Sequence, residues 1–182
     1  FLFSVVLGLI MVPLLRRMRL GQKISEFVGE AHRKKEGTPT MGGLIFIIPT
    51  IVVVSGLVLT KKIDYTSNLG IVLLVFIGYT LIGFLDDFLS IRKGNNEGLT
   101  TYQKLFMQVL IAIGFFYIYM RSGGQTSWVV GTLHIDIEFG WLYGLVILFI
   151  LVGASNAVNL TDGLDGLSGG LSAISFLAFG LI

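Results

Sequence analysis

The residues of this sequence best suited to chemistry follow a long apolar run near its end. At the end of the run 139–158 and directly after it come two carboxamides and two carboxylates, those of Asn156, Asn159, Asp162 and Asp165. A charged side chain at the centre of a bilayer costs about 2.5–3.5 kcal/mol on insertion scales. Acids beside apolar runs therefore indicate a functional site at which oxygen ligands gather.

Two backbone arrangements would bring these side chains together. If the chain stays helical, Asn159, Asp162 and Asp165 share a single stripe, because residues three apart lie on one face. If it does not, Gly163 and Gly166 allow a tight turn that presents both acids. The alternative to a site is a polar loop between two helices, with Asp165 capping the second one.

A second acidic pair, Asp86 and Asp87, ends the apolar run 69–85. Adjacent residues on a helix point about 100° apart, so the two carboxylates need not serve the same ligand. Mg²⁺ suits such a pair, because it takes one or two carboxylates together with water and substrate phosphates. The alternative is a helix end whose acids pair with Arg92 or Lys93. Acids at the C-terminus of a helix oppose its dipole, which favours the functional interpretation.

A basic, glycine-rich segment precedes the second apolar run. Lys34 and Lys35 come first, then Thr38 and Thr40, and the helix expected from residue 41 follows directly. The N-terminus of a helix offers unpaired N–H groups and the positive end of the helix dipole. With ammonium and hydroxyl groups beside it, such a segment suits a phosphate group. The alternative is a set of basic residues that anchors the cytoplasmic side of the protein.

The composition places these candidate residues in a membrane protein. The chain has 182 residues, of which 54% are hydrophobic and 13% charged, with a mean hydropathy of +0.86; a soluble domain has about 25% charged residues. It has no cysteine, which excludes disulfides and thiolate metal sites within these residues. No nucleic-acid partner is expected. Because the sequence begins at Phe1 without a methionine and ends at Ile182 inside an apolar run, we expect a fragment of a longer protein.

Six continuous apolar runs predict an all-α fold, a polytopic bundle of transmembrane helices. A span needs about 20 residues, and a helix satisfies its own backbone hydrogen bonds in lipid. Two β-prone segments flank Gly131-Thr132 within 127–137 and predict a short extracytoplasmic β-hairpin. We expect residues 1–182 to form a single transmembrane domain, with spans at approximately 1–15, 41–60, 69–88, 102–120, 139–158 and 166–182.

The basic residues set the orientation of these spans. Loops one and three, residues 16–40 and 86–104, hold seven and three of the thirteen lysines and arginines. Because basic loops stay on the cytoplasmic side, both loops are expected there, and the segment 156–166 follows by alternation. The aspartates then share one face of the membrane with Lys35 and Lys104. Carboxylates suited to Mg²⁺ beside cations suited to phosphate describe a phosphoryl-transfer site at the membrane rim.

Three motifs together resemble the bacterial phospho-N-acetylmuramoyl-pentapeptide-transferase family, also called translocase I. They are Gly37-Thr-Pro-Thr-Met-Gly-Gly43, Gly83-Phe-Leu-Asp-Asp87 and the segment Asn156–Gly166, in matching order. The resemblance implies about ten transmembrane helices, an active site open to the cytoplasm, a homodimer and residence in the bacterial plasma membrane. It also implies transfer of phospho-MurNAc-pentapeptide from UDP-MurNAc-pentapeptide to undecaprenyl phosphate, which yields lipid I and UMP and requires Mg²⁺.

The resemblance further assigns roles to individual residues. Asp86 is expected to be the base near the lipid phosphate and a ligand of the metal, with Asp87 beside it as a second catalytic residue. A third aspartate, the principal Mg²⁺ ligand, and a histidine-rich loop are expected after Ile182, so this chain alone would be inactive. The residues expected to bind substrate are Lys35, Thr38, Thr40, Lys104, Asn156, Asn159, Asp162, Gly163 and Asp165.

Three other functions agree with parts of the pattern. A related phosphotransferase that uses a UDP-N-acetylhexosamine would share the acids, but Thr-Met-Gly-Gly and Asn-Ala-Val-Asn favour the first family. The segment 162–166 also begins the signature of CDP-alcohol phosphotransferases, which next requires Ala-Arg where this chain has Gly169-Gly170. A cation-coupled transporter would place its acids near the midplane of the membrane, in discontinuous helices.

Overall fold

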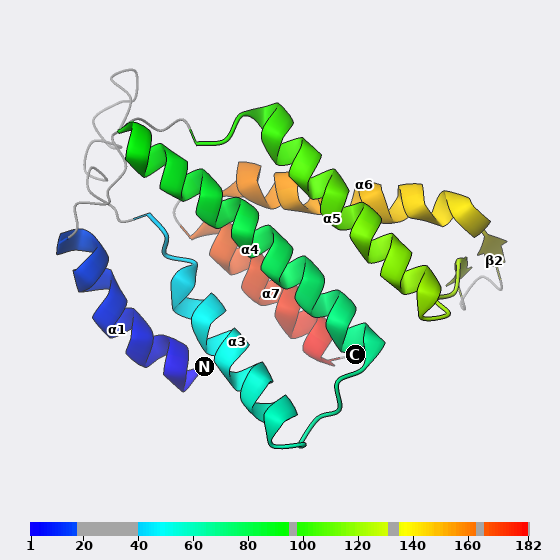
Figure 1. Ribbon diagram of the computed structural model, residues 1–182, viewed down its shortest axis with the longest axis horizontal. Coiled ribbons are helices and arrows are strands. Elements are labelled where there is room, and N and C mark those ends of the chain that lie inside the picture. The colour runs from blue at the N-terminus through cyan, green and yellow to red at the C-terminus, as the bar shows by residue number, and fades with distance from the viewer. Residues whose placement is uncertain (18–39, 95–97, 131–134, 163–165, 182) are drawn as a thin grey trace. The chain divides into compact units, whose positions relative to one another are not determined.

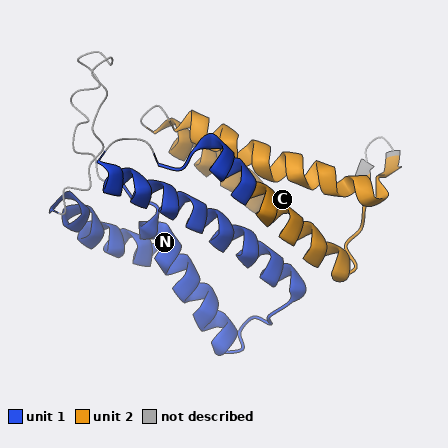
Figure 2. Cartoon of the chain, turned by 45° about the horizontal axis from the view of Figure 1, so that its top comes forward, with its two compact units in different colours: residues 1–107 blue, residues 108–182 orange. Residues whose placement is uncertain are grey.

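The computed structural model describes residues 1–17, 40–94, 98–130, 135–162 and 166–181 (Figure 1). The chain divides into two compact units, Phe1–Met107 and Gln108–Ile182, which Figure 2 shows in blue and orange. Each unit is described by itself. Nearly all of the described residues outside the short connections are helical, as the continuous apolar runs predict.

The first unit is built from helices α1 (Leu2–Arg17), α3 (Leu44–Leu59) and α4 (Ser67–Lys93), and from the first turns of α5 (Thr101–Arg121). Helices α1 and α3 lie side by side (Figure 1). Gly8 of α1 allows the two helices to pack closely because it has no side chain. A side-chain carbon at this position would lie only 3.3 Å from Ile45 Cγ2 of α3.

Two helix ends in this unit differ from the sequence prediction. Helix α3 begins at Leu44 rather than at residue 41, because Met41 has a φ of +64°, in the left-handed region that a right-handed helix excludes. Helix α4 continues past the predicted end at residue 88 to Lys93, where Gly94 closes it in the left-handed conformation. Asp86 therefore lies about two turns inside α4 rather than at its end.

The second unit contains the rest of α5, a hairpin and two further helices. Strands β1 (Ser127–Val130) and β2 (Ile135–Glu138) pair antiparallel, with Ser127 opposite Glu138, which confirms the predicted hairpin. A 3₁₀ turn (Gly140–Leu142) leads into α6 (Tyr143–Thr161), and α7 (Leu167–Leu181) follows.

Aromatic side chains connect the hairpin to the helices of the second unit. Trp128 of β1 lies with its ring centroid 6.4 Å from that of Phe139, and Phe139 lies 6.5 Å from Tyr143 at the start of α6. The ring of Tyr143 stacks on Tyr119 of α5 at 5.9 Å. Aromatic pairs at these distances stabilise a contact by about 0.5–1.5 kcal/mol beyond their buried area. This cluster fixes the ends of α5 and α6 nearest the hairpin.

Three of the described helices have the length and the apolar composition of membrane spans. Among the described residues, three stretches are long and apolar enough to cross a bilayer, namely Ser67–Lys93, Thr101–Arg121 and Gly140–Thr161, while α3 and α7 are shorter apolar helices. Large apolar side chains such as Phe149 and Phe179 are exposed along them. In a membrane such a surface contacts lipid instead of water. Exposed apolar side chains on these helices therefore do not need to be covered by other parts of the protein. The predicted fold, a bundle of membrane helices with a short hairpin, is confirmed.

Candidate active site

Asp86 joins α4 to the beginning of α5 within the first unit. Its Oδ2 lies 2.8 Å from Lys104 Nζ, and its Oδ1 accepts a hydrogen bond of 2.7 Å from the backbone N–H of Leu99. Both charged side chains are 27% exposed. The expected alternative partners were Arg92 and Lys93, and that expectation is wrong for Asp86, because the chain reverses after α4 and brings Lys104 back to it.

The turn before α5 packs closely against Asp86. Gly98 packs so closely that a side-chain carbon there would overlap the Asp86 carboxylate and lie 2.6 Å from the Asp86 carbonyl oxygen. Lys93, one of the expected partners, instead donates a hydrogen bond of 3.0 Å from Nζ to the carbonyl of Gly98. The available space therefore favours glycine at this position, and for any larger residue either the turn or the carboxylate must move.

Asp87 faces a different segment, as expected for adjacent residues of a helix. Its Oδ2 accepts a hydrogen bond of 2.8 Å from the backbone N–H of Met41, immediately before α3. A left-handed conformation costs a residue such as Met41 about 1–2 kcal/mol. A hydrogen bond to a charged group contributes about 1.5–3 kcal/mol, enough to offset that cost. Asp87 thus holds the turn that follows Thr40 in its strained conformation.

The acid-and-amide segment lies largely on a helix. Helix α6 includes Asn156 and Asn159 and ends at Thr161, so the first of the two expected backbone arrangements, the helical one, holds up to this point. Asp162 is the C-cap residue, and its backbone N–H donates to the carbonyl of Val158 at 3.1 Å. The side chains of Asn159 and Asp162 are exposed and three positions apart, so both project from one side of the helix end.

The side chain of Asn156 forms hydrogen bonds with α5 and with its own helix inside the second unit. Its Nδ2 donates to Gln108 Oε1 at 2.9 Å and to the carbonyl of Val152 at 2.8 Å, while Gln108 Nε2 donates to Ser155 Oγ at 3.2 Å. Gln108 is only 4% exposed. Sequence reasoning passed over Gln108 and Ser155, although an amide inside the apolar run 105–120 is a signal that could have identified the first of them.

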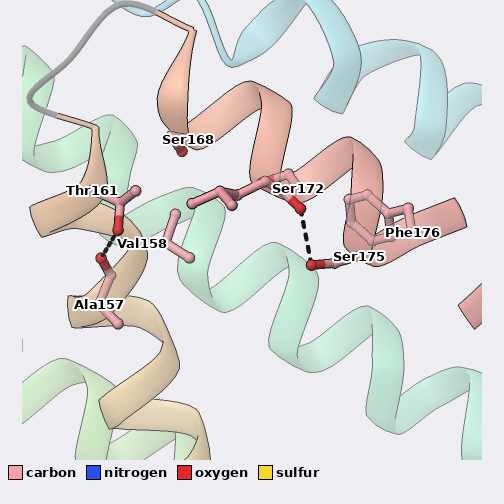
Figure 3. A pocket seen from close by; sticks show the side chains of 8 residues that line it. Ala157, Val158, Thr161, Ser168, Ser172, Ser175 and Phe176 are labelled. Atoms are coloured by element: carbon pink, nitrogen blue, oxygen red, sulfur yellow. Dashed lines mark hydrogen bonds between the residues drawn. The ribbon is translucent and has the colours of Figure 1, made fainter. Parts of the chain in front are cut away.

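A small hollow lies between α6 and α7 (Figure 3). Its volume is about 250 Å³, and hydroxyl groups of both helices line it, among them those of Thr161, Ser168 and Ser172. Thr161 Oγ1 donates within its own helix, to the carbonyl of Ala157 at 2.7 Å. Pockets for small molecules measure about 300–1,000 Å³, so this hollow is too small to enclose a whole nucleotide-sugar.

The expected site residues fall into two groups and a remainder. In the first unit, Asp86 pairs with Lys104, and Asp87 accepts a hydrogen bond from Met41. Thr40 is half-buried beside Met41. The second unit holds Asn156, Asn159 and Asp162 along one end of α6. The remaining expected residues lie outside the described part of the chain: Lys35, Thr38, Gly163 and Asp165.

The acidic pair supplies part of a ligand set for a divalent cation. Within the described ranges, no group of three or more His, Cys, Asp or Glu side chains lies close enough to hold a metal ion. Both Asp86 oxygens are engaged, whereas within the same ranges Asp87 Oδ1 accepts no hydrogen bond. Mg²⁺ takes one or two carboxylates and fills its other positions with water and phosphate oxygens. The pair fits that ion as an incomplete site, with Asp87 the more available ligand.

The fold and these side chains define a membrane protein with an acid-and-lysine cluster suited to phosphate chemistry. The chain belongs to glycosyl transferase family 4, whose sequence model matches residues 69–182. Residues 35–47 also match the phospho-N-acetylmuramoyl-pentapeptide-transferase signature 1. The signature includes Met41, whose N–H Asp87 binds. The resemblance drawn from the three motifs is confirmed.

Curated relatives agree with the family assignment. The chain is 45% identical to proteins named phospho-N-acetylmuramoyl-pentapeptide-transferase from Oceanobacillus iheyensis and Bacillus velezensis, and 44% identical to the protein of that name from Bacillus subtilis. Each comparison covers 100% of this chain and 56% of the relative. The chain therefore spans little more than half the length of these relatives.

Proposed function

We propose that this chain is part of an enzyme that transfers phospho-MurNAc-pentapeptide from UDP-MurNAc-pentapeptide to undecaprenyl phosphate, giving lipid I and UMP. The observation that carries the proposal is the contact between Asp87 and Met41. It ties the acidic pair of α4 to the backbone of the segment 35–47, which matches the transferase signature. The names of the similar proteins supply the substrates.

The reaction needs positioning and charge more than covalent chemistry from the protein. An oxygen of undecaprenyl phosphate attacks the β-phosphate of the UDP-sugar, a new phosphorus–oxygen bond forms, and the bond to the α-phosphate breaks to release UMP. Asp86 takes the remaining proton from the attacking phosphate. Lys104 is held 2.8 Å from Asp86, and its ammonium group would offset phosphate charge.

Asp86 and Asp87 would hold Mg²⁺ together with ligands outside the described residues. When bound, that ion neutralises negative charge on the diphosphate. Asp87 would also keep the turn at Met41 in place, so that the backbone leading into α3 meets the substrate phosphates in a fixed conformation. Lys35, Thr38 and Thr40 belong to the segment that would contact those phosphates.

The end of α6 would bind the nucleotide-sugar. Asn159 and Asp162 are exposed there, and a carboxylate at the C-cap accepts hydrogen bonds from N–H or hydroxyl groups of a ligand. Gly163 and Asp165 would complete this part of the site, with Asn156 nearby. Asp162 opposes the dipole at the C-terminus of its helix, so a ligand that donates to it relieves an unfavourable interaction.

Asp162→Asn is expected to weaken binding of UDP-MurNAc-pentapeptide by about tenfold, because a hydrogen bond to a charged acceptor becomes one to a neutral acceptor. Isothermal calorimetry on the complete protein in detergent measures the change. Asp136→Asn is the matched control, since Asp136 is exposed on β2 of the same unit and loses the same charge. Unchanged affinity in Asp162→Asn would show that this aspartate only ends a helix.

The surroundings of the enzyme follow from the same proposal. We place it in the bacterial plasma membrane, with the acids and Lys104 at the cytoplasmic face, because the basic residues concentrate in the loops beside them. The bilayer then supplies undecaprenyl phosphate, and the cytoplasm supplies the nucleotide-sugar. A homodimer is expected from the resemblance to the transferase family.

The assignment is tested by assaying the complete protein in lipid vesicles. UMP release is expected to require both UDP-MurNAc-pentapeptide and undecaprenyl phosphate, and to stop when EDTA removes divalent cations. If the protein instead transfers phosphosugar from UDP-N-acetylglucosamine and leaves UDP-MurNAc-pentapeptide untouched, it is the related hexosamine phosphotransferase. If it turns over neither nucleotide-sugar, the proposed function is wrong.

A further inference from the structure

A hydrogen-bonded cluster joins α5 to α6 in the interior of the second unit. Gln108 of α5 uses both ends of its amide: Nε2 donates to Ser155 at 3.2 Å, and Oε1 accepts from Asn156 at 2.9 Å. Its two partners are consecutive residues of α6, so the amide contacts that helix at two neighbouring points. Two such bonds fix both the rotation of α6 about its axis and its position along α5.

The position of Gln108 does not require an amide for packing. Ala112 lies one turn further along the same face of α5 and is buried to 2% exposure with only a methyl group. An apolar side chain at residue 108 could pack against α6 in the same way and would avoid placing a polar group in a candidate membrane span. The amide at this position therefore needs an explanation beyond the contact between two helices.

The residues of this cluster are close in sequence to residues proposed to act on the substrate. Gln108 follows Lys104 by four residues in α5, so both project from the same side of that helix. Asn156 precedes Asn159 by three residues and Asp162 by six in α6. A rotation of α6 that breaks the bonds of Asn156 would therefore turn Asn159 and Asp162 away from their present direction.

We propose that Gln108 is a positioning residue for the transfer reaction, one that acts through Asn156 to aim the nucleotide-binding end of α6. This inference rests on the proposed function. Asn156 then serves chiefly as the partner of Gln108, because Gln108 and the carbonyl of Val152 take its Nδ2 donors.

Gln108→Leu in the complete protein tests this role. Two interhelical hydrogen bonds of ordinary strength in a membrane are together worth about a factor of ten. We expect the variant to raise the Kd and KM for UDP-MurNAc-pentapeptide about tenfold, while the KM for undecaprenyl phosphate stays unchanged. Asn156→Leu breaks only one of the two bonds and leaves the one between Gln108 and Ser155, so we expect a smaller rise of about threefold. The double variant is expected to be no worse than Gln108→Leu alone, because that substitution already breaks both bonds.

The control is Thr80→Val, which removes a half-buried hydroxyl from α4 that bonds only to its own helix, at the carbonyl of Phe76. It is expected to leave the Kd and KM unchanged. If Gln108→Leu fails to accumulate in membranes, Gln108→Asn carries the same test, since it keeps the amide but shortens its reach by one methylene group.

Two results would overturn the inference. One is a normal Kd and KM in both Gln108 variants. The other is a loss of activity that follows only the amount of folded protein, as thermal unfolding reports it, with the KM of the remaining enzyme unchanged. Either result differs from failure of the proposed function, in which the unaltered protein shows no transfer.

Discussion

Asp86→Asn is expected to reduce transfer by about 1,000-fold or more while the protein still folds. Asparagine has nearly the same shape as aspartate, and its Oδ1 can still accept the hydrogen bond from Leu99. It cannot accept a proton from the attacking phosphate, and general-base catalysis contributes about 10²–10⁴-fold. The variant also loses the charge that holds Lys104 at 2.8 Å. Initial rates of UMP release from the complete protein in lipid vesicles measure the effect.

A comparison with Lys104→Met separates two explanations of that loss. If Asp86 acts only by holding Lys104, the two single variants and the double variant should lose activity equally. If Asp86 is the base and Lys104 offsets phosphate charge by itself, Asp86→Asn should be the slower of the two single variants, and the double variant should be slower still. Turnover of Asp86→Asn within a few-fold of the unaltered protein would contradict the proposed role of this aspartate.

Gly98→Ala is expected to lower transfer by about 100-fold, although residue 98 carries no functional group. A side-chain carbon there would overlap the Asp86 carboxylate, so the turn or the carboxylate must move by about an ångström. A displacement of that size at a reacting group costs about 10²-fold in rate. The kcat of UMP release is the quantity to measure, because the change affects the base and leaves Asn159 and Asp162, the residues proposed to bind the nucleotide-sugar, untouched.

The matched control for that variant is Gly56→Ala. A side-chain carbon at Gly56 of α3 meets no atom within 4 Å, so the same substitution is made in the same unit without a collision. Its kcat is expected to match that of the unaltered protein. Equal rates for Gly98→Ala and Gly56→Ala would show that the close contact between Gly98 and Asp86 is not needed for transfer.

Much of the fold could be predicted from the sequence because apolar runs report helices directly. The hairpin was also predictable, since two β-prone segments surround Gly131-Thr132. The ends of the helices were harder to predict from the sequence. The extension of α4 to Lys93 crosses charged residues that end an apolar run but do not end a helix, and Gly94 stops it instead. The late start of α3 depends on the left-handed Met41, a conformation that no pattern of residue types indicates.

The partners of the site residues were harder to predict than the residues themselves. Asp86 and Asp87 stand out because acids beside an apolar run are rare, but the sequence suggested Arg92 or Lys93 as their partners, a few residues away. The structure pairs Asp86 with Lys104 and Asp87 with Met41, the latter 46 residues distant. Gln108 was overlooked for the same reason, since its partner Asn156 lies 48 residues further along the chain. Contacts of this kind depend on which helices pack together in the folded chain, and the pattern of residue types does not report that.

We propose that the Asp86 segment and the end of α6 both serve transfer from UDP-MurNAc-pentapeptide at the cytoplasmic face. Thiol protection in the complete protein tests it directly, because residues 1–182 contain no cysteine and any cysteine elsewhere in the protein can first be replaced by serine. Single variants Thr100→Cys and Thr161→Cys are treated with a membrane-impermeant thiol reagent in oriented vesicles. We predict that both react only from the cytoplasmic side and that UDP-MurNAc-pentapeptide with Mg²⁺ protects both. Reaction of the two positions from opposite sides, or protection of only one of them, would contradict the claim.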